Sequence, residues 1–446
     1  MAVRSADLGA AVEGAAGLRI VDGAVRVEDE AALRREGAHT LVRRAVFGPD
    51  QAARDAAFAA IRAACAEVGI YSASHDGLYR ARAAGAWAGR TVPAFNLRFL
   101  VFDSARAAFR AAHRARVGPF IFEIARSEMG YTEQRPAEYG ACVLAAALAE
   151  GHRGPVFLQG DHFQVNAKKD RIAEVEALRA LVAEALAAGF RNIDIDASTI
   201  VDLSRPTEEE AQAENAAITA TLCGAVRRLQ GQGTPVSVGG EIGEVGKANS
   251  TERELTAFMD GVDAALSEMG QRLGLSKVSV QTGTSHGGVP LPDGTIAQVA
   301  VDFGVHERLG RVAREEYGMG GTVQHGASTL PEELFDRFPA AGTVEIHLAT
   351  GFQNLLLDSL DAQGRAYVDN WVAHNLQGER AASDTDEQFL YKNRKRAAGP
   401  LKRWLWDLPE AERGRLGEIL EARFALMYDK LGMTDSLGLI EEHVRP

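Results

Sequence analysis

Disulfide pairs, long apolar runs and an excess of basic residues are all missing from this sequence of 446 residues. Its three cysteines, Cys65, Cys142 and Cys223, lie far apart in alanine-rich surroundings, which is typical of small core residues and not of a disulfide set or a zinc cluster. We find no uninterrupted apolar run of about 18 residues and therefore expect no transmembrane helix. The opening stretch MAVRSADLGAAVEGAAG has no apolar segment, so we also expect no signal peptide and a cytoplasmic protein.

The charge balance limits the partners that the surface can attract. The chain has 49 basic and 61 acidic residues, a formal net charge of −12. A surface of this sign does not favour nucleic acid, although a local basic patch at a substrate site remains possible. We therefore expect a small-molecule ligand, with no nucleic acid or membrane partner.

From Thr91 onward, short apolar runs alternate with long alanine- and leucine-rich segments of helical character. Segments such as 170–188 and 208–230 are long enough to be crossover helices. Eight strands, each followed by a helix, predict a (β/α)8 TIM barrel over residues 91–351. The expected strands are TVPAFN (91–96), PFIFEIA (119–125), PVFLQG (155–160), NIDIDA (192–197), PVSVGGE (235–241), KVSVQTGT (277–284), GTVQHGA (321–327) and GTVEIHLAT (342–350).

Two regions lie outside this barrel, and one alternative fold also has alternating strands and helices. Residues 1–90 are expected to form an N-terminal extension with a hairpin, LRIVDGAVRV, followed by helices; residues 352–446 are expected to form a helical C-terminal extension. A doubly wound open sheet is the alternative fold. It would require a glycine-rich phosphate loop after the first strand, and PAFNLRFL is not one.

Three histidines stand at predicted strand ends. His162 ends the third strand, His286 follows the sixth, and His325 ends the seventh. The carboxyl ends of barrel strands form the active-site face, so these side chains are expected to meet there. Three imidazoles with one open coordination position are typical of a catalytic zinc site. The sequence therefore predicts a metal centre at the mouth of the barrel.

Asp161 precedes His162 directly. Because neighbours along a strand face opposite sides, Asp161 is not expected to bind the same metal, and proton transfer at a bound substrate is its expected task. His347 lies inside the eighth strand and could face either the site or the outer helices. The remaining histidines are expected to be solvated or packed; they are His39, His75, His113, His152, His306, His374 and His443.

Further polar and small residues follow the strands. Asp194 and Asp196 share one face of the fourth strand, and Glu241 ends the fifth, where it could bind a second metal or orient a histidine. Each could equally be a rim carboxylate paired with a lysine or an arginine. Small residues after strands six to eight leave backbone N–H groups open to a phosphate; they are Gly287, Gly288, Gly326, Ser328 and Thr350.

Taken in order, these motifs resemble those of the class II, zinc-dependent ketose-bisphosphate aldolases. The resemblance extends from TVPAFN to EIHLATG and includes the Asp-His pair, GGEIGEVG, GTSHGG and VQHGAS. The combination is specific, whereas each motif alone is not. The chain length and the segment EIARSEMGYT are also similar to the GatZ/KbaZ-type subunit branch of tagatose-bisphosphate aldolases.

The resemblance implies a zinc-dependent aldolase that cleaves or forms a fructose- or tagatose-bisphosphate-like ketose through the enediolate of dihydroxyacetone phosphate. It implies that His162, His286 and His325 hold zinc and that Asp161 moves the proton on the aldehyde-derived oxygen. Asp196 and Glu241 match a second position for a metal or a monovalent cation. It also implies a homo-oligomer. The implied substrate-binding residues are Asn96, Gly287, Gly326, Ser328, Thr350 and, for the distal phosphate, Arg396.

The sequence departs from that family at three places. The loop after the fifth strand has Asn249 near the position of the family's catalytic glutamate, and Glu252 is our candidate for that base. In the eighth strand, His347 and Ala349 replace the family's Asn-x-Asp pattern, and the loop DHFQVNAKK is longer. These changes weaken the expectation that the substrate is the glycolytic fructose 1,6-bisphosphate.

Two other functions were weighed. A non-catalytic, GatZ-like partner subunit would agree with the chain length and the altered loop, but the three metal histidines favour an enzyme. A metal-dependent hydrolase on the same barrel would require a His-x-His pair at the first strand, and PAFNLRF has none.

Overall fold

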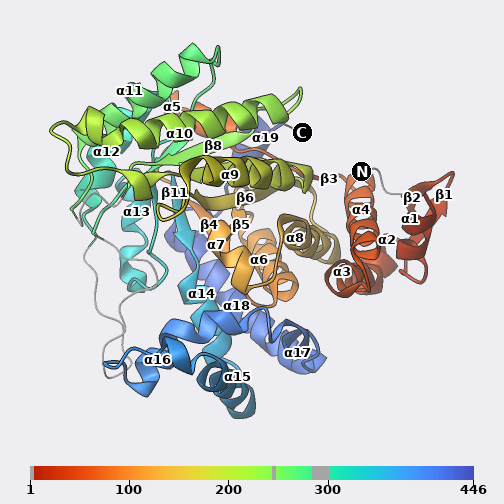
Figure 1. Ribbon diagram of the computed structural model, residues 1–446. Helices are drawn as coiled ribbons and strands as arrows, with labels where there is room; N and C mark the ends of the chain where they lie inside the picture. Colours follow the sequence, from red (N-terminus) through yellow and green to blue (C-terminus); the bar gives the residue numbers. More distant parts are fainter. Residues whose placement is uncertain (1–4, 244–247, 284–300, 446) are drawn as a thin grey trace.

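The computed structural model describes residues 5–243, 248–283 and 301–445. Its centre is a nine-stranded parallel sheet in which β11 pairs with β4 and β6 with β7, so that eight of the strands close into a barrel (Figure 1). This confirms the predicted (β/α)8 fold. The barrel strands are β4 Val92–Asn96, β5 Ile121–Ala125, β6 Gly154–Gln164, β7 Asn192–Asp196, β8 Ser237–Glu241, β9 Lys277–Ser279, β10 Thr322–Gln324 and β11 Glu345–Leu348.

Helices surround the barrel, as the alternation in the sequence predicts. Each apolar helix face packs on the strands because both faces of a parallel sheet must be covered. α18 packs against α6, and its Phe424 ring lies 4.7 Å from that of Phe95 on β4. The helices between and after the strands are α6 Val101–Ala115, α7 Arg126–Tyr131, α8 Pro136–Glu150, α9 Arg171–Ala187, α10 Glu208–Leu229, α11 Glu252–Glu268, α12 Phe303–Glu315, α13 Arg337–Ala340, α14 Thr350–Asp358 and α18 Glu410–Lys430, with short 3-10 turns at Ser198–Ile200 and Glu332–Leu334.

The N-terminal segment includes the expected hairpin and lies against one side of the barrel, next to α8 (Figure 1). The hairpin turns at Asp22 and Gly23, both with positive φ (52° and 78°), which is the geometry of a two-residue hairpin turn. The elements are α1 Ser5–Val12, β1 Leu18–Val21, β2 Ala24–Val27, α2 Glu30–Ala32, a π-helical turn Leu33–Gly37, α3 Ala38–Phe47 and α4 Gln51–Glu67.

An additional strand, which sequence analysis did not predict, connects this segment to the barrel. β3, Ile70–Ser72, pairs with the start of β6, and α5, Asp76–Ala83, follows it. The backbone N–H of His75 donates to Asn192 Oδ1 at the start of β7, and the Tyr79 hydroxyl donates to Glu345 at the start of β11. Residues 73–79 therefore cover the N-terminal end of the barrel.

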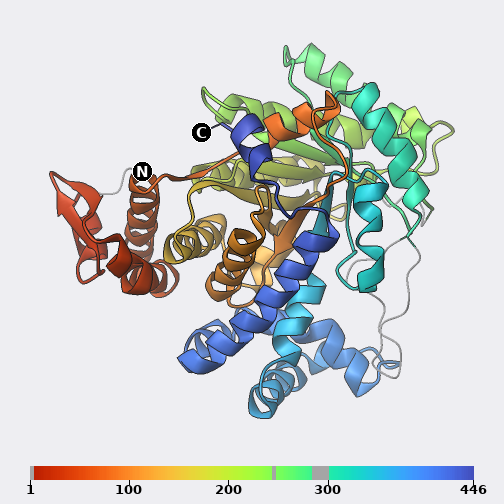
Figure 2. The ribbon, with the colours of Figure 1, turned by 180° about the vertical axis from the view of Figure 1, so that it is seen from behind.

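The C-terminal region is helical. Figure 2 shows its last helix, α19, returning to lie beside α5 at the N-terminal side of the barrel. Within the described residues, no helix combines the length and the apolar character that crossing a membrane requires. The remaining elements are α15 Ala362–Asn375, a 3-10 turn Gln377–Glu379, α16 Asp386–Asn393, a 3-10 turn Arg394–Ala397, α17 Lys402–Trp406 and α19 Leu437–His443.

The interior of the barrel contains charged side chains where bulky apolar residues are usual. The Lys277 ammonium on β9, only 1% exposed, lies 2.8 Å from Asp194 Oδ2 and 2.5 Å from Glu345 Oε1. Gln159 accepts from the same ammonium at 2.8 Å and donates to Glu123 Oε2 at 3.0 Å. This buried cluster, defined here as Glu123, Gln159, Asp194, Lys277 and Glu345, lies directly below the histidines of the barrel mouth.

Candidate active site

A bulge in β6 places Asp161 and His162 at the mouth of the barrel. The pairing of β6 with β7 shifts register between Gly160 and Phe163, and His162 has φ +39°. A Cβ atom at Gly160 would lie 2.5 Å from the fully buried ring of Phe163, so only glycine fits there. A bulge of this kind turns neighbouring side chains towards the same side of a sheet.

This bulge corrects one expectation. Alternation along a regular strand predicts that Asp161 and His162 face apart, yet Asp161 Oδ1 lies 3.8 Å from His162 Nε2. Ligand atoms of Asp161, His162 and His325 all lie within 4.8 Å of one another. The expected separation is therefore wrong, because the extra residue in the bulge interrupts the alternation.

His162 and His325 meet with their inward-facing nitrogens only 3.0 Å apart, between His162 Nε2 and His325 Nδ1. The opposite nitrogen of each ring has a partner of its own. His162 Nδ1 lies 3.0 Å from Asp196 Oδ2 and 3.0 Å from Glu241 Oε2, and His325 Nε2 lies 2.9 Å from Ser279 Oγ. Such outer partners orient metal-binding imidazoles and fix their tautomers.

The donor set fits a metal of the zinc type. Tetrahedral coordination with Zn–N bonds of about 2.0–2.1 Å separates two ligand nitrogens by about 3.3 Å, close to the observed spacing. Asp196 and Glu241, which were predicted at a second cation position, contact the outer side of the same His162 ring and also form a possible ligand group with it. The third predicted ligand, His286, and the predicted phosphate contact Gly287 lie outside the described residues.

Carboxylates dominate the electrostatics around His162. Burial lowers the pKa of His162, but Asp161 and Glu241 outweigh burial and hold that pKa well above its usual value. Burial and the charge of Asp196 raise the pKa of Glu241 to about 7. A cation between these side chains would balance the excess of negative charge, and binding it would release the proton from His162.

Asp161 is held by His347 of β11, the histidine whose orientation the sequence left open. His347 Nδ1 lies 3.2 Å from Asp161 Oδ1 and 3.1 Å from Glu123 Oε2, and its Nε2 lies 2.6 Å from Glu345 Oε1. Ionised carboxylates only accept hydrogen bonds, so both ring nitrogens act as donors. Burial lowers the pKa of His347, but Glu123 and Asp161 raise it well above its usual value.

A cavity of about 260 Å³ opens over these residues at the carboxyl ends of the strands. The predicted residue Asn96 lines it, and the Oδ1 atom of Asn96 has no hydrogen-bond partner among the described residues. Gly326, Ser328 and Thr350 line one side of the cavity, and Thr350 is the first residue of α14. The N-terminus of a helix beside a glycine-containing loop suits an anion such as phosphate.

The loop and the helix on that side are in close contact. The Gly351 backbone N–H donates to Ser328 Oγ at 3.1 Å, and a Cβ atom at Gly351 would lie 2.2 Å from the Ser328 carbonyl oxygen. Gly326 has φ +69°, a conformation that favours glycine. We call Gly326, Ser328, Thr350 and Gly351 the anion cradle.

Two predicted residues are not brought to this cavity. Glu252 begins α11, its side chain is 47% exposed, and it lies 3.9 Å from Arg311 Nη2. Arg396 forms an ion pair with Glu379. Its neighbour Lys395 lines the cavity instead, together with Arg98, which pairs with Glu128 at 2.7 Å.

Sequence reasoning missed Glu123, Gln159, Lys277 and Glu345, and it left His347 undecided. A signal was present, because a charged residue inside an apolar strand, as in PFIFEIA or GTVEIHL, needs a partner within the fold. The identity of that partner depends on which strands face one another across the barrel, and no local pattern carries that information.

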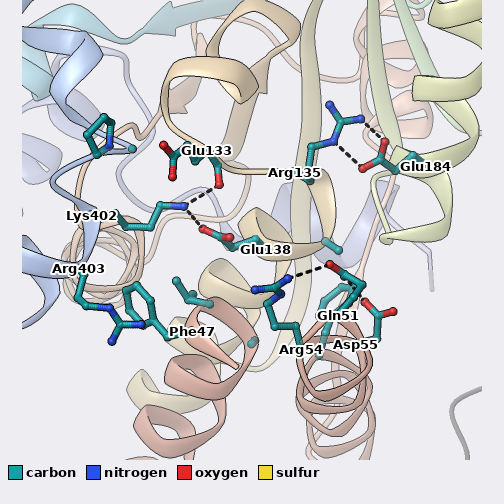
Figure 3. Close-up of a pocket in the computed structure, with 16 residues that line it drawn as sticks. Phe47, Gln51, Arg54, Asp55, Glu133, Arg135, Glu138, Glu184, Lys402 and Arg403 are labelled. Atoms are coloured by element: carbon teal, nitrogen blue, oxygen red, sulfur yellow. Dashed lines mark hydrogen bonds and ion pairs between the residues drawn. The ribbon is translucent and has the colours of Figure 1, made fainter. Parts of the chain in front are cut away.

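A larger hollow, of about 780 Å³, lies between the N-terminal helices and α8 and α17 (Figure 3). Its charged side chains face one another: Arg135 Nε lies 2.9 Å from Glu184 Oε1, and Lys402 Nζ lies 2.6 Å from Glu138 Oε1 (Figure 3). Arg403 lies over the ring of Phe47. Because these charges already have partners, this hollow does not compete with the barrel mouth as the candidate site.

Comparisons with known proteins gave one family match and several similar structures. A family model described as class-II fructose-bisphosphate aldolase matches residues 80–402. A search of curated protein sequences found no match.

Several solved structures are similar to the chain. A probable tagatose 6 phosphate kinase from Sinorhizobium meliloti 1021 has a TM-score of 0.55 at 19% identity, covering 78% of this chain and 100% of its own. The YdjI aldolase from Escherichia coli K12 has a TM-score of 0.51 at 13% identity, and the match covers 82% of this chain and 99% of the YdjI chain. Fructose-bisphosphate aldolase from Campylobacter jejuni has a TM-score of 0.50 at 17% identity, and the match covers 82% of this chain and 97% of that aldolase. At these identities the similarity shows the shared barrel fold.

Proposed function

The chain belongs to the class-II fructose-bisphosphate aldolase family, and from that premise we propose that it is a zinc-dependent aldolase acting on a phosphorylated ketose. The observation that carries this proposal is the meeting of His162 and His325, 3.0 Å apart, beside Asp161 at the mouth of the barrel. Two oriented imidazoles and an adjacent carboxylate are among the groups that a metal-assisted aldol cleavage requires.

His162 and His325, with His286 as the further predicted ligand, are the residues that would hold the metal, which when bound supplies Lewis-acid polarisation of the ketose carbonyl. Asp196, Glu241 and Ser279 keep the two described rings in place through their outer nitrogens. Because the rings are oriented in advance, little rearrangement is needed when the metal and substrate bind.

Asp161 is the proposed proton-transfer group. Its carboxylate lies at the cavity, 3.8 Å from His162 Nε2, where the oxygen derived from the aldehyde would lie beside the metal ligands. In cleavage Asp161 takes the hydroxyl proton as the carbon–carbon bond breaks, and in condensation it returns that proton.

The other cavity residues support a phosphorylated, polyhydroxylated substrate. Asn96 Oδ1 and Glu123 Oε1 have no hydrogen-bond partner among the described residues, and both side chains line the cavity. These acceptors suit sugar hydroxyls, while the anion cradle suits a phosphate. Lys395 lines the same cavity and supplies a cation for a second phosphate, so we propose a fructose- or tagatose-bisphosphate-like ketose.

The test of this function is aldol condensation by the isolated, zinc-loaded chain. Incubation with dihydroxyacetone phosphate and a panel of aldehydes, followed by identification of the products, is expected to yield a phosphorylated ketose. If no aldehyde reacts while the protein is folded and holds zinc, the proposal is wrong and the result favours a partner subunit of the GatZ type.

Asp161→Asn is expected to lower kcat for cleavage by about 10²- to 10⁴-fold, the usual contribution of a general acid–base group. The amide keeps the shape of the carboxylate but cannot take a proton. Steady-state cleavage rates and zinc content measure the effect. A variant that binds zinc and cleaves as fast as the unmodified chain would remove Asp161 from the mechanism.

Gly351→Ala is expected to raise KM for phosphorylated substrates by about 10- to 100-fold, the equivalent of one lost hydrogen bond to a charged group. Its Cβ atom would meet the Ser328 carbonyl oxygen at 2.2 Å and push the loop away from α14. Gly414→Ala on α18, where a Cβ meets nothing within 4 Å, is the matched control. Unchanged KM in the Gly351 variant contradicts phosphate binding at the cradle.

A further inference from the structure

We propose that His347 is a positioning residue that holds the Asp161 carboxylate in the orientation needed for proton transfer and anchors it to the buried cluster. This inference rests on the proposed aldolase function. His347 is 5% exposed, lies in the wall of the cavity, and connects the proton-transfer group above it to fixed charges below it.

One nitrogen of the His347 ring contacts Asp161, and the other contacts Glu345. Nδ1 lies 3.2 Å from Asp161 Oδ1, whereas Nε2 lies 2.6 Å from Glu345 Oε1. A ring bonded at both ends cannot rotate without losing a contact to a carboxylate. Since Asp161 has only two side-chain torsions, fixing one of its oxygens defines where the other oxygen points.

Glu345 is itself a firm anchor. Its Oε1 lies 2.5 Å from the Lys277 ammonium and accepts from Gln159 Nε2 at 2.9 Å, while its Oε2 accepts from the Tyr79 hydroxyl. These partners come from β9, β6 and α5, so the position of Glu345 is determined by three separate elements. His347 transmits that fixed position to Asp161.

Glu123 completes the support from a fourth direction. Its Oε2 lies 3.1 Å from His347 Nδ1 and accepts from Gln159 Nε2 at 3.0 Å. The Nδ1 hydrogen therefore lies between two carboxylates, one on β5 and one on β6. This arrangement stabilises Asp161 beside Glu123, where two carboxylates alone would repel each other.

The same contacts separate this role from metal binding. His347 belongs to two possible ligand groups, one with Glu123 and Glu345 and the other with Asp161 and Asp194. The Lys277 ammonium lies against both Asp194 and Glu345, and a second cation among them would meet its positive charge at close range. His347 therefore acts through Asp161, and a displacement of about 1 Å in a group of that kind costs about 10²-fold in rate.

Two amide substitutions distinguish the two ends of the ring. The amide nitrogen of asparagine occupies the place of Nδ1, and that of glutamine occupies the place of Nε2. His347→Asn therefore keeps a donor to Asp161, whereas His347→Gln keeps only the contact with Glu345. We expect His347→Gln to lose about 10²-fold in kcat for cleavage and His347→Asn to lose less than about 10-fold.

The measurement compares two reactions of each zinc-loaded variant: cleavage of the ketose phosphate, and exchange of the carbon-bound proton of dihydroxyacetone phosphate in D2O. Asp161 acts in cleavage and not in exchange. A positioning defect therefore lowers kcat for cleavage, while KM, the exchange rate and the zinc content stay nearly constant. A merely structural defect lowers both reactions together. His75→Gln, which disturbs the buried cluster at Gln159 without contacting Asp161, is the control.

Glu345→Gln provides a second variant, expected like His347→Asn to lower cleavage by less than about 10-fold with exchange retained, because both weaken the contact with Glu345 and keep a donor to Asp161. Equal cleavage by His347→Gln and the unmodified chain, or equal losses in the asparagine and glutamine variants, would overturn the inference. So would a parallel loss of exchange and cleavage. If the unmodified chain catalyses neither reaction, the proposed function fails, and this inference falls with it.

Discussion

Replacing His162 with alanine is expected to remove both the bound metal and the cleavage activity. The substitution deletes one of two imidazole nitrogens that lie 3.0 Å apart and leaves Asp196 and Glu241 facing each other without the ring between them. A Lewis acid contributes several kcal/mol to stabilising the transition state, so the loss in kcat/KM should be on the order of 10³-fold or more.

Zinc content, measured by elemental analysis after dialysis, and steady-state cleavage together test this expectation. The unmodified chain should retain about one zinc per chain. Asp196→Asn, which removes the carboxylate beside His162 Nδ1, is expected to lose about 10- to 100-fold in metal affinity. His374→Ala, an exposed histidine on α15, is the matched control. If His162→Ala keeps its zinc and its activity, the metal centre assigned here is wrong.

Lys277→Met is expected to destabilise the folded barrel by about 3–5 kcal/mol, the usual cost of removing one partner from a buried ion pair. The substitution preserves most of the side-chain volume but leaves Asp194 and Glu345 without the ammonium that lies 2.8 and 2.5 Å from them. Two uncompensated carboxylates inside the barrel then favour the unfolded chain, where water solvates them.

Urea denaturation followed by circular dichroism measures this change in the free energy of unfolding. Lys169→Met is the matched control, because the Lys169 side chain is 62% exposed and its pair with Glu174 spans 3.6 Å. That surface pair is expected to contribute at most about 1 kcal/mol. Equal stability of the Lys277 and Lys169 variants would show that the buried cluster does not stabilise the barrel.

The strand order of the barrel could be read from the sequence because each strand is a short apolar run between long helical segments. The positions of His162 and His325 followed from the rule that carboxyl strand ends share one face. That reasoning needs only the local pattern and the chain order, and in this fold both are sufficient to bring residues 163 positions apart to a distance of 3.0 Å.

The bulge at Asp161 and His162 could not be read in the same way. Whether a strand alternates regularly depends on its pairing with β7, where the register shifts, and on the packing of Phe163 over Gly160. The contacts of Lys277 on β9 with Asp194 on β7 and Glu345 on β11 cross the barrel interior. Such partners are determined by the closed geometry of the sheet, and local sequence does not contain it.

The position of Glu252 shows what spacing along a loop does not determine. Spacing along the loop after β8 suggested a base near the substrate, whereas the residue begins α11 and is half exposed beside Arg311. A capping box at Thr251 and Glu254 starts the helix at this point. These capping residues are visible in the sequence, and they predict the start of the helix better than spacing along the loop predicts a catalytic base.

Proton exchange of dihydroxyacetone phosphate tests the central claim most directly. The isolated chain is loaded with zinc, stripped by a chelator, and reloaded, and incorporation of deuterium from D2O is followed by NMR in each state. We expect exchange in the loaded protein, loss of exchange in the stripped protein and recovery after zinc is restored. Equal exchange by the stripped protein, or none by the folded, loaded protein, would contradict a metal-dependent aldolase.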